Sequence, residues 1–243
     1  MSTDPHSLAA ERAPLERARF SSKLDILLGL AAEGLLMAGA VAAALALRGR
    51  FSMSLFASLL AFGITLFFET LLMMWFIRSV APMRGGVFAP GSSTRIAWNL
   101  IGFLDTNLGW CGQGGLMPVP LRKLYYRARG CSIGAGLVII GGRLGDPYLV
   151  TIGREAMIGD GALVIGHALT ANDTLVLGRV RIGQGAVVGA RSLVMPGVEV
   201  GAGAMINAGS VVAMNTHIGA GEVWSGNPAR CVRTSGGEVV EAI

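Results

Sequence analysis

The sequence predicts a mainly β fold in which a parallel β-helix follows a two-helix transmembrane hairpin. Two observations lead to this fold class: two long apolar stretches lie near the start of the chain, and eleven of the thirteen positions spaced six apart from residue 152 to residue 224 are Ile or Val. The composition agrees, because 52% hydrophobic and only 14% charged residues make the chain more apolar than an ordinary soluble protein. Part of the chain is therefore expected to lie in lipid.

The apolar stretches cover residues 26–47 and 55–77, and each is longer than the about 20 residues that a spanning helix needs. The short link RGRFSMS joins them, which favours a retained hairpin over a signal peptide. The link holds only Arg48 and Arg50, whereas the outer flanks of the hairpin carry more basic residues. These are Arg12, Arg17, Arg19, Lys23, Arg78, Arg84 and Arg95. The positive-inside rule then predicts a multi-pass protein of the inner (cytoplasmic) membrane with both termini in the cytoplasm.

Each apolar stretch contains one carboxylate, Glu33 or Glu69. Both lie roughly 11–12 Å from the cytoplasmic end of their helix, at about 1.5 Å per residue. A charge at that depth costs at least about 2.5 kcal/mol, so each is expected to face protein, to be protonated, or to share a proton with the other. Two roles stay open: fixing helix packing or oligomer register, and making a polar contact with a lipid-linked substrate.

A period of six residues dominates the second half of the chain. Its positions are Ile152, Ile158, Val164, Thr170, Val176, Ile182, Val188, Val194, Val200, Ile206, Val212, Ile218 and Trp224. Three such hexads would make one triangular coil with the aliphatic side chains inside and glycines at the corners. Each coil buries its core only by stacking on its neighbours. Ile133 and Ile139 extend the series backwards with a shift of one residue, and the insertion is expected in GGRLGDPYL.

Over residues 131–232 the chain resembles the hexapeptide-repeat acyltransferases. The motifs that carry the resemblance are GHAL at 166–169, GARSLVMPGVEVGAGAMINAGSVV at 189–212 and GNPAR at 226–230, in the order of the galactoside and maltose type acetyltransferases. The resemblance implies a left-handed parallel β-helix, a homotrimer, and acetyl-CoA or another acyl-CoA as co-substrate.

The resemblance also assigns a role to His167, which matches the general base of these enzymes. A neutral imidazole can accept a proton near pH 7, which is typically worth 10² to 10⁴ in rate. Asn172 and Asp173, in the polar stretch TANDT, are the nearest candidates to orient the ring, although solvating a loop is an equal alternative. His217 precedes an aliphatic position, so it is expected to point outward and is the second-choice catalytic residue.

By the same resemblance, the CoA co-substrate would contact Ala190, Ala208, Ser210 and Arg230, with the guanidinium of Arg230 meeting phosphate oxygens. No metal site is expected, because the repeat domain contains only two histidines. The three cysteines show no CxxC pair or metal-ligand spacing and are expected to be reduced structural thiols. They are Cys111, Cys131 and Cys231.

The sequence divides into five segments: a cytoplasmic N-terminal tail (1–23), the transmembrane hairpin (24–80), a juxtamembrane interfacial segment (81–130), the acyltransferase β-helix (131–232) and a C-terminal tail (233–243). The juxtamembrane segment has aromatic residues beside a basic cluster, which suits the lipid headgroup zone. These residues are Trp98, Trp110, Tyr125 and Tyr126. The other expectation is that the segment packs against the first coil and caps the β-helix, and the two are compatible.

The predicted function is a membrane-anchored acyltransferase that moves an acetyl or other small acyl group to a hydroxyl or amine of a membrane-associated acceptor. A lipid-linked sugar is the favoured acceptor. Two alternatives stay open. A two-helix membrane unit followed by DPYLVTIG is also similar to terminal units of poly-amino-acid synthetases, which form an amide from a thioester on a carrier protein. A catalytically inert scaffold at the membrane is the other.

The chain carries a net charge of +5, and much of the excess of basic residues flanks the apolar stretches, where anionic lipid headgroups would be the neighbours. Nucleic acid is therefore not an expected partner.

Overall fold

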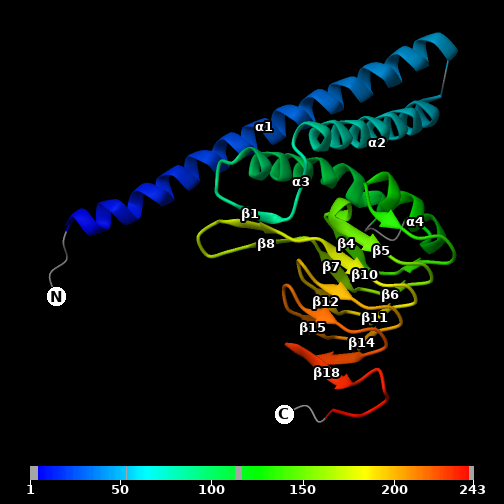
Figure 1. Cartoon of the computed structure of the whole chain (residues 1–243). Helices are drawn as coiled ribbons and strands as arrows, with labels where there is room; N and C mark the ends of the chain where they lie inside the picture. Colours follow the sequence, from blue (N-terminus) through cyan, green and yellow to red (C-terminus); the bar gives the residue numbers. More distant parts are fainter. Residues whose placement is uncertain (1–4, 53, 113–116, 241–243) are drawn as a thin grey trace. The chain divides into compact units, whose positions relative to one another are not determined.

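The computed structural model describes residues 5–52, 54–112 and 117–240. The chain forms two compact units, which we call the helical unit and the β-helix unit (Figure 1). The helical unit comprises Met1–Pro82, Phe88–Trp110 and Ala171–Thr174, and the β-helix unit comprises Met83–Val87, Cys111–Thr170 and Leu175–Ile243.

The helical unit contains α1 (Pro5–Phe51), α2 (Leu55–Val80) and α3 (Ser93–Gly112). Two stretches, Ile26–Phe51 and Leu55–Val80, are long and apolar enough to cross a membrane by length and composition. Because α1 begins at Pro5, the predicted N-terminal tail is largely helical instead, as its many Ala, Leu, Glu and Arg residues favour. The side chains of several residues used above are not among those described. They are Arg12, Arg17, Arg19, Lys23, Trp110 and Cys111.

A polar cluster joins the three helices. The side-chain amide of Asn107 in α3 donates to Glu33 Oε2 at 3.1 Å and lies 3.4 Å from Thr70 Oγ1. Thr70 is fully buried in α2, and its hydroxyl donates to Leu66 O at 2.7 Å. Glu33 therefore faces protein, as expected. Glu69 Oε2 is buried with no hydrogen-bond partner in the described part of the chain, and the sharing of a proton between Glu33 and Glu69 stays a prediction.

Three sheets, parallel except for one strand, form the walls of the β-helix unit. In chain order around a coil, the first sheet contains β2 (Ser132–Ile133), β5 (Val150–Ile152), β10 (Val180–Ile182), β13 (Glu199–Val200) and β16 (His217–Ile218). The second contains β3 (Ile139–Ile140), β6 (Met157–Ile158), β11 (Val187–Val188), β14 (Met205–Ile206), β17 (Val223–Gly226) and the antiparallel β18 (Ala229–Arg233). The third contains β4 (Arg143–Gly145), β7 (Leu163–Ile165), β12 (Leu193–Val194) and β15 (Val211–Val212). This arrangement confirms the predicted parallel β-helix.

Stacking in register explains the period of six. In the second sheet, for example, Ile158, Val188 and Ile206 pair as neighbours and are fully buried. Equivalent inward positions of successive coils form a column of aliphatic side chains that excludes water from the interior of the β-helix. This burial of apolar surface is the main source of its stability. The aliphatic series therefore marks the inner face of the β-helix, as predicted.

The first coil departs from the predicted register. Ile140, rather than Ile139, is the fully buried residue and pairs with Ile158. One extra residue thus lies before Ile140, and not only in GGRLGDPYL as predicted. The inward residues Ile140 and Leu144 are therefore closer together in the sequence than their partners in the next coil, Ile158 and Val164. The chain regains the hexad register through a 3-10 turn, η1 (Pro147–Leu149).

A second departure interrupts the series between Val164 and Ile182. Here β8 (His167–Leu169) and β9 (Leu175–Leu177) form an antiparallel hairpin, and the order in their sheet is β1-β9-β8, with β1 at Gly86–Phe88. Thr170 is exposed and Val176 is only half-buried, so neither is the inward residue of a hexad. The series keeps its phase across the hairpin only because the interval happens to equal three hexads.

Helix α4 (Val119–Ala128) closes the first coil. Tyr125 and Tyr126 are buried, and the hydroxyl of Tyr126 accepts a hydrogen bond from Leu144 N at 3.2 Å. Arg122 and Arg127 donate to backbone carbonyls of that coil, which are those of Ile133, Ile140 and Gly141. The predicted packing against the first coil is therefore confirmed, because α4 covers the apolar core of the end coil and binds its carbonyls. The headgroup location of the segment is compatible with this packing and stays a prediction.

The predicted C-terminal tail also has structure. After β18 the chain turns and returns, with Thr234 N donating to Glu238 O at 2.9 Å and Val240 N donating to Val232 O at 3.0 Å. A bridge joins Arg233 and Val239. This return covers the last strand of the second sheet.

Candidate active site

The candidate site lies at the third corner of the coil, where the chain passes from the third sheet back to the first. Strands β4 and β7 pair so that Gly145 is opposite Ile165, which makes Asp146 and Gly166 neighbours at this corner. His167 follows at the first position of β8. Two residues that are far apart in the sequence are thus brought together by the stacking of the first two coils.

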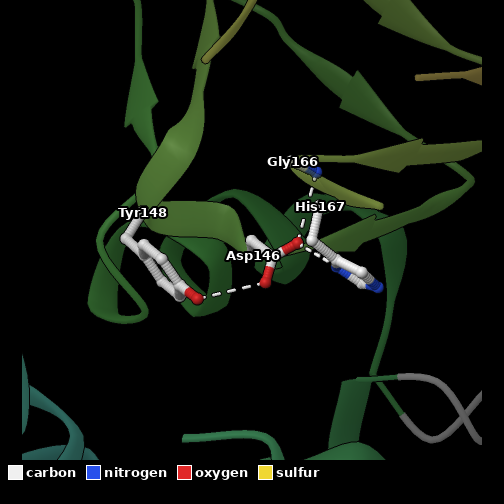
Figure 2. A network of polar contacts seen from close by, with 4 residues as sticks. All are labelled: Asp146, Tyr148, Gly166 and His167. Atoms are coloured by element: carbon white, nitrogen blue, oxygen red, sulfur yellow. Dashed lines mark hydrogen bonds and ion pairs between the residues drawn. The ribbon is translucent and has the colours of Figure 1, made fainter. Parts of the chain in front are cut away.

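Asp146 is the centre of a polar network (Figure 2). Its Oδ2 lies 2.5 Å from Nδ1 of His167 and accepts a hydrogen bond from Gly166 N at 3.2 Å. Its Oδ1 accepts a hydrogen bond from the hydroxyl of Tyr148 at 3.0 Å. The Asp146 side chain is only 7% exposed, whereas the His167 side chain is 31% exposed. The carboxylate is therefore held inside the corner while the imidazole remains accessible.

Local sequence explains why the corner can form. Asp146 has φ +53°, a left-handed conformation that Asp tolerates better than most residues, and Pro147 starts the 3-10 turn directly after it. A Cβ at Gly166 would lie 2.9 Å from Cβ of Leu149, so glycine is required for this close approach. The segments GDPYL and GH are consequently the two halves of one corner.

The geometry suits proton transfer. A carboxylate on Nδ1 holds the imidazole in the tautomer that carries hydrogen on Nδ1, and it stabilises the imidazolium that forms when a proton is accepted. Nε2 is then the nitrogen that would take a proton from a substrate. A pair of this kind can deprotonate a hydroxyl or an amine as that group attacks a carbonyl carbon.

The structure brings neither of the predicted orienting residues to the imidazole. Asp173 lies at the tip of the β8–β9 hairpin, where its carboxylate pairs with Arg95 of α3 at 2.9 Å within the helical unit. Asn172 is exposed beside it. Asp146 was not among the residues that the sequence suggested, because it lies one coil before His167. The motif DPYL, where the hexad period breaks, was the signal that could have identified it.

His217 is in a different environment. It points outward from β16 with a 74% exposed side chain, as predicted. Its Nδ1 is 3.5 Å from Glu199 Oε2, and Glu199 Oε1 also pairs with Arg181 at 2.6 Å. His217 therefore lies on the outer face of the first sheet beside an exposed carboxylate, Glu199, whereas the carboxylate beside His167, Asp146, is buried.

The predicted CoA contacts fall in two groups. Ala190 and Ala208 are exposed at the same corner of successive coils, joined by a hydrogen bond from Gly209 N to Ala190 O at 2.9 Å, and Arg230 is exposed on β18. Ser210 needs a correction, because its side chain is fully buried and its hydroxyl accepts from Gly226 N at 3.2 Å. It fills the prism wall rather than lining a surface. Within the described ranges, no group of three or more His, Cys, Asp or Glu side chains could hold a metal ion.

Residues 179–213 match the family model described as bacterial transferase hexapeptide (six repeats). The match covers these residues alone, and it agrees with the hexapeptide period seen in the sequence and in the stacked strands. No curated protein matches the chain.

Several solved structures are similar at low identity. A galactoside acetyltransferase in complex with coenzyme A is 19% identical over 67% of this chain and 90% of that one, with a TM-score of 0.48. A maltose O-acetyltransferase from Clostridium difficile 630 is 18% identical over 49% and 75% of the two chains (TM-score 0.37). A serine acetyltransferase from Brucella abortus strain S19 is 15% identical over 85% and 69% (TM-score 0.38). At these identities the likeness says nothing about the substrate.

Proposed function

We propose that the protein is a CoA-dependent O- or N-acyltransferase in which His167, oriented by Asp146, is the general base. The observation that carries the proposal is the Asp146–His167 pair, which combines a buried carboxylate with an accessible imidazole at an interrupted corner of a hexapeptide β-helix. The acyl-CoA donor is supported by the motifs GHAL and GNPAR and by the family match over residues 179–213.

In the proposed reaction, Nε2 of His167 takes the proton of an acceptor hydroxyl or amine as its oxygen or nitrogen attacks the thioester carbonyl. The carboxylate of Asp146 stabilises the resulting imidazolium through Nδ1. The C–S bond then breaks, the new ester or amide leaves with the acyl group, and the imidazolium returns its proton to the departing thiolate. Ala190, Ala208 and Arg230 remain the proposed contacts of the donor, and Ser210 does not.

We further propose that α1 and α2 anchor the enzyme in the inner membrane with both termini cytoplasmic, and that the acceptor is membrane-associated, with a lipid-linked sugar as the favoured class. Only 17% and 11% of the two apolar windows are buried within the protein. Large side chains on both helices are consequently exposed, among them Leu27, Leu35, Phe56 and Leu72. Apolar surface of this extent needs lipid or protein to cover it.

The outer faces of the β-helix support a homotrimer. The first sheet is polar outside, whereas the outward columns of the second and third sheets are mostly apolar. Their apolar members are Met157, Val187 and Met205 in the second sheet, and Leu163, Leu193 and Val211 in the third. The exposed Arg143 of β4 is the charged residue in the third column. Other copies of the chain are the proposed cover for these two faces. We expect Met205→Glu to convert the oligomer to monomers, measured as the mass of the detergent-solubilised protein by light scattering, with His217→Glu on the polar face as the matched control.

Transfer of labelled acetyl from acetyl-CoA in native membranes tests the function. We expect the label to enter a lipid-extractable product with the wild type and with His217→Ala, and to fall at least about 10²-fold with His167→Ala. Equal labelling by His167→Ala would contradict the role of His167. If label moves only when the acyl group is supplied on a carrier protein, the amide-forming alternative replaces the CoA proposal. If no label moves and CoA does not bind, the scaffold alternative does.

A further inference from the structure

Resting on the proposed role of His167, we propose that Tyr148 is a positioning residue that acts through Asp146: its hydrogen bond weakens the stabilisation that the carboxylate gives to protonated His167, which favours the imidazole form that accepts a proton. Tyr148 does not contact the imidazole in the network that Figure 2 shows. Its hydroxyl binds the carboxylate oxygen that His167 does not use.

The two oxygens of Asp146 have separate partners. Oδ2 meets His167 and Gly166, and Oδ1 meets Tyr148. Tyr148 is the middle residue of η1, and the hydrogen bond from Leu149 N to Asp146 O at 2.8 Å fixes the turn that separates the phenol from the carboxylate. The hydroxyl is thus held at Oδ1 by local backbone geometry.

This arrangement affects charge as well as position. A donor at Oδ1 draws part of the carboxylate charge away from Oδ2, so the carboxylate stabilises an imidazolium less than it would without Tyr148. The titratable groups of the network are the Asp146 carboxyl, the Tyr148 phenol and the His167 imidazole. Among their neighbours, Leu177 lies opposite His167 on β9 and Leu149 packs against Gly166, and both side chains are apolar.

Removing the phenol hydroxyl should therefore make His167 harder to deprotonate. The expected change is small, because only part of the effect of one hydrogen bond to Asp146 reaches His167 through the carboxylate. We expect Tyr148→Phe to raise the titration midpoint of His167 by about 0.3–1 pH unit, since one unit corresponds to about 1.4 kcal/mol. The acid limb of the kcat/KM profile should move to higher pH by the same amount.

The test is an NMR titration of the full chain in detergent with isotope-labelled histidine. The chain has only three histidines, so His6 and His217 are internal references, and His167→Gln assigns the third signal. Tyr125→Phe is the matched control, because it removes a buried tyrosine hydroxyl that Arg129 binds on the capping segment. We expect the His167 midpoint to rise in Tyr148→Phe alone and to stay at the wild-type value in Tyr125→Phe.

A second variant tests the route through Asp146. In an Asp146→Asn background, adding Tyr148→Phe should no longer raise the midpoint of His167, because the carboxylate charge that Tyr148 shares has gone. An unchanged or lowered midpoint in the single variant Tyr148→Phe, or an equal rise in both backgrounds, would overturn the inference. A rise in midpoint in a protein that transfers no acyl group would support the inference and refute the proposed function, so the two failures are distinguishable.

Discussion

The third corner of the β-helix is built in two ways, and the contrast locates the chemistry. In the later coils it is short: residues 195–198 and 213–216 stack directly, with Gly197 and Asn215 in left-handed conformations and Asn215 N donating to Pro196 O at 3.0 Å. In the first two coils the same corner is lengthened by η1 and by the β8–β9 hairpin. The regular corner holds the stack together, and the irregular corner is where ionisable side chains meet.

The largest expected effect comes from the irregular corner. Asp146→Asn should lower kcat/KM by roughly 10²–10⁴-fold, because an amide cannot hold the same tautomer or stabilise the imidazolium. Asn tolerates the left-handed conformation at this position, so the fold should remain. Asp173→Asn is the matched control, since its carboxylate pairs with Arg95 instead, and it should change kcat/KM less than tenfold. Equal losses in the two variants would remove the distinction between the corner and the hairpin tip.

The regular stack should respond in stability rather than in rate. Ile206→Ala removes a fully buried side chain and should destabilise the β-helix by about 2–5 kcal/mol. Leu169→Ala changes an exposed side chain on the hairpin and should cost no more than about 0.5 kcal/mol. Thermal melting followed by circular dichroism would compare them. A larger loss for Leu169→Ala would mean that the hairpin, rather than the stack, limits stability.

The smallest effect concerns the capped first coil at high pH. Burial raises the pKa of the Cys131 thiol from 9.0 to about 12, and burial also raises the pKa of Tyr126 above 10.0. Both groups ionise more readily in the unfolded chain, so their contribution to stability is complete below about pH 9 and is lost as the pH rises towards 12. The melting temperature should fall over this range, and Cys131→Ala should reduce the slope. An unchanged slope in that variant would show that ionisation of Cys131 does not drive the loss.

Local patterns in the sequence predicted much of the fold. The two apolar stretches became α1 and α2, and inward residues such as Val188, Val194 and Ile206 are buried where the hexads placed them. His167 was recognisable because the aliphatic series breaks directly after it. These features depend on residues close in sequence, whose period of six alone determines which side chains face inward.

The remaining features depend on how separate segments stack. A shift of one residue in the first coil exchanged Ile139 for Ile140, and the hairpin carried Thr170 and Val176 out of the series. Ser210 was assigned to a surface although the same small size suits the prism wall. Small and polar residues at corners fit several environments equally well, so period alone could not distinguish them.

The sequence by itself determined the two apolar helices, the hexapeptide stack and the histidine at its interruption. Only the tertiary structure decided which groups those residues meet: Asp146 for His167, Asn107 for Glu33, and the first coil for Tyr126. The physical reason is that such contacts depend on the summed lengths of every turn between two segments. One residue more or less in a coil rotates the next side chain to a different neighbour, whereas the burial of an aliphatic residue tolerates any apolar partner.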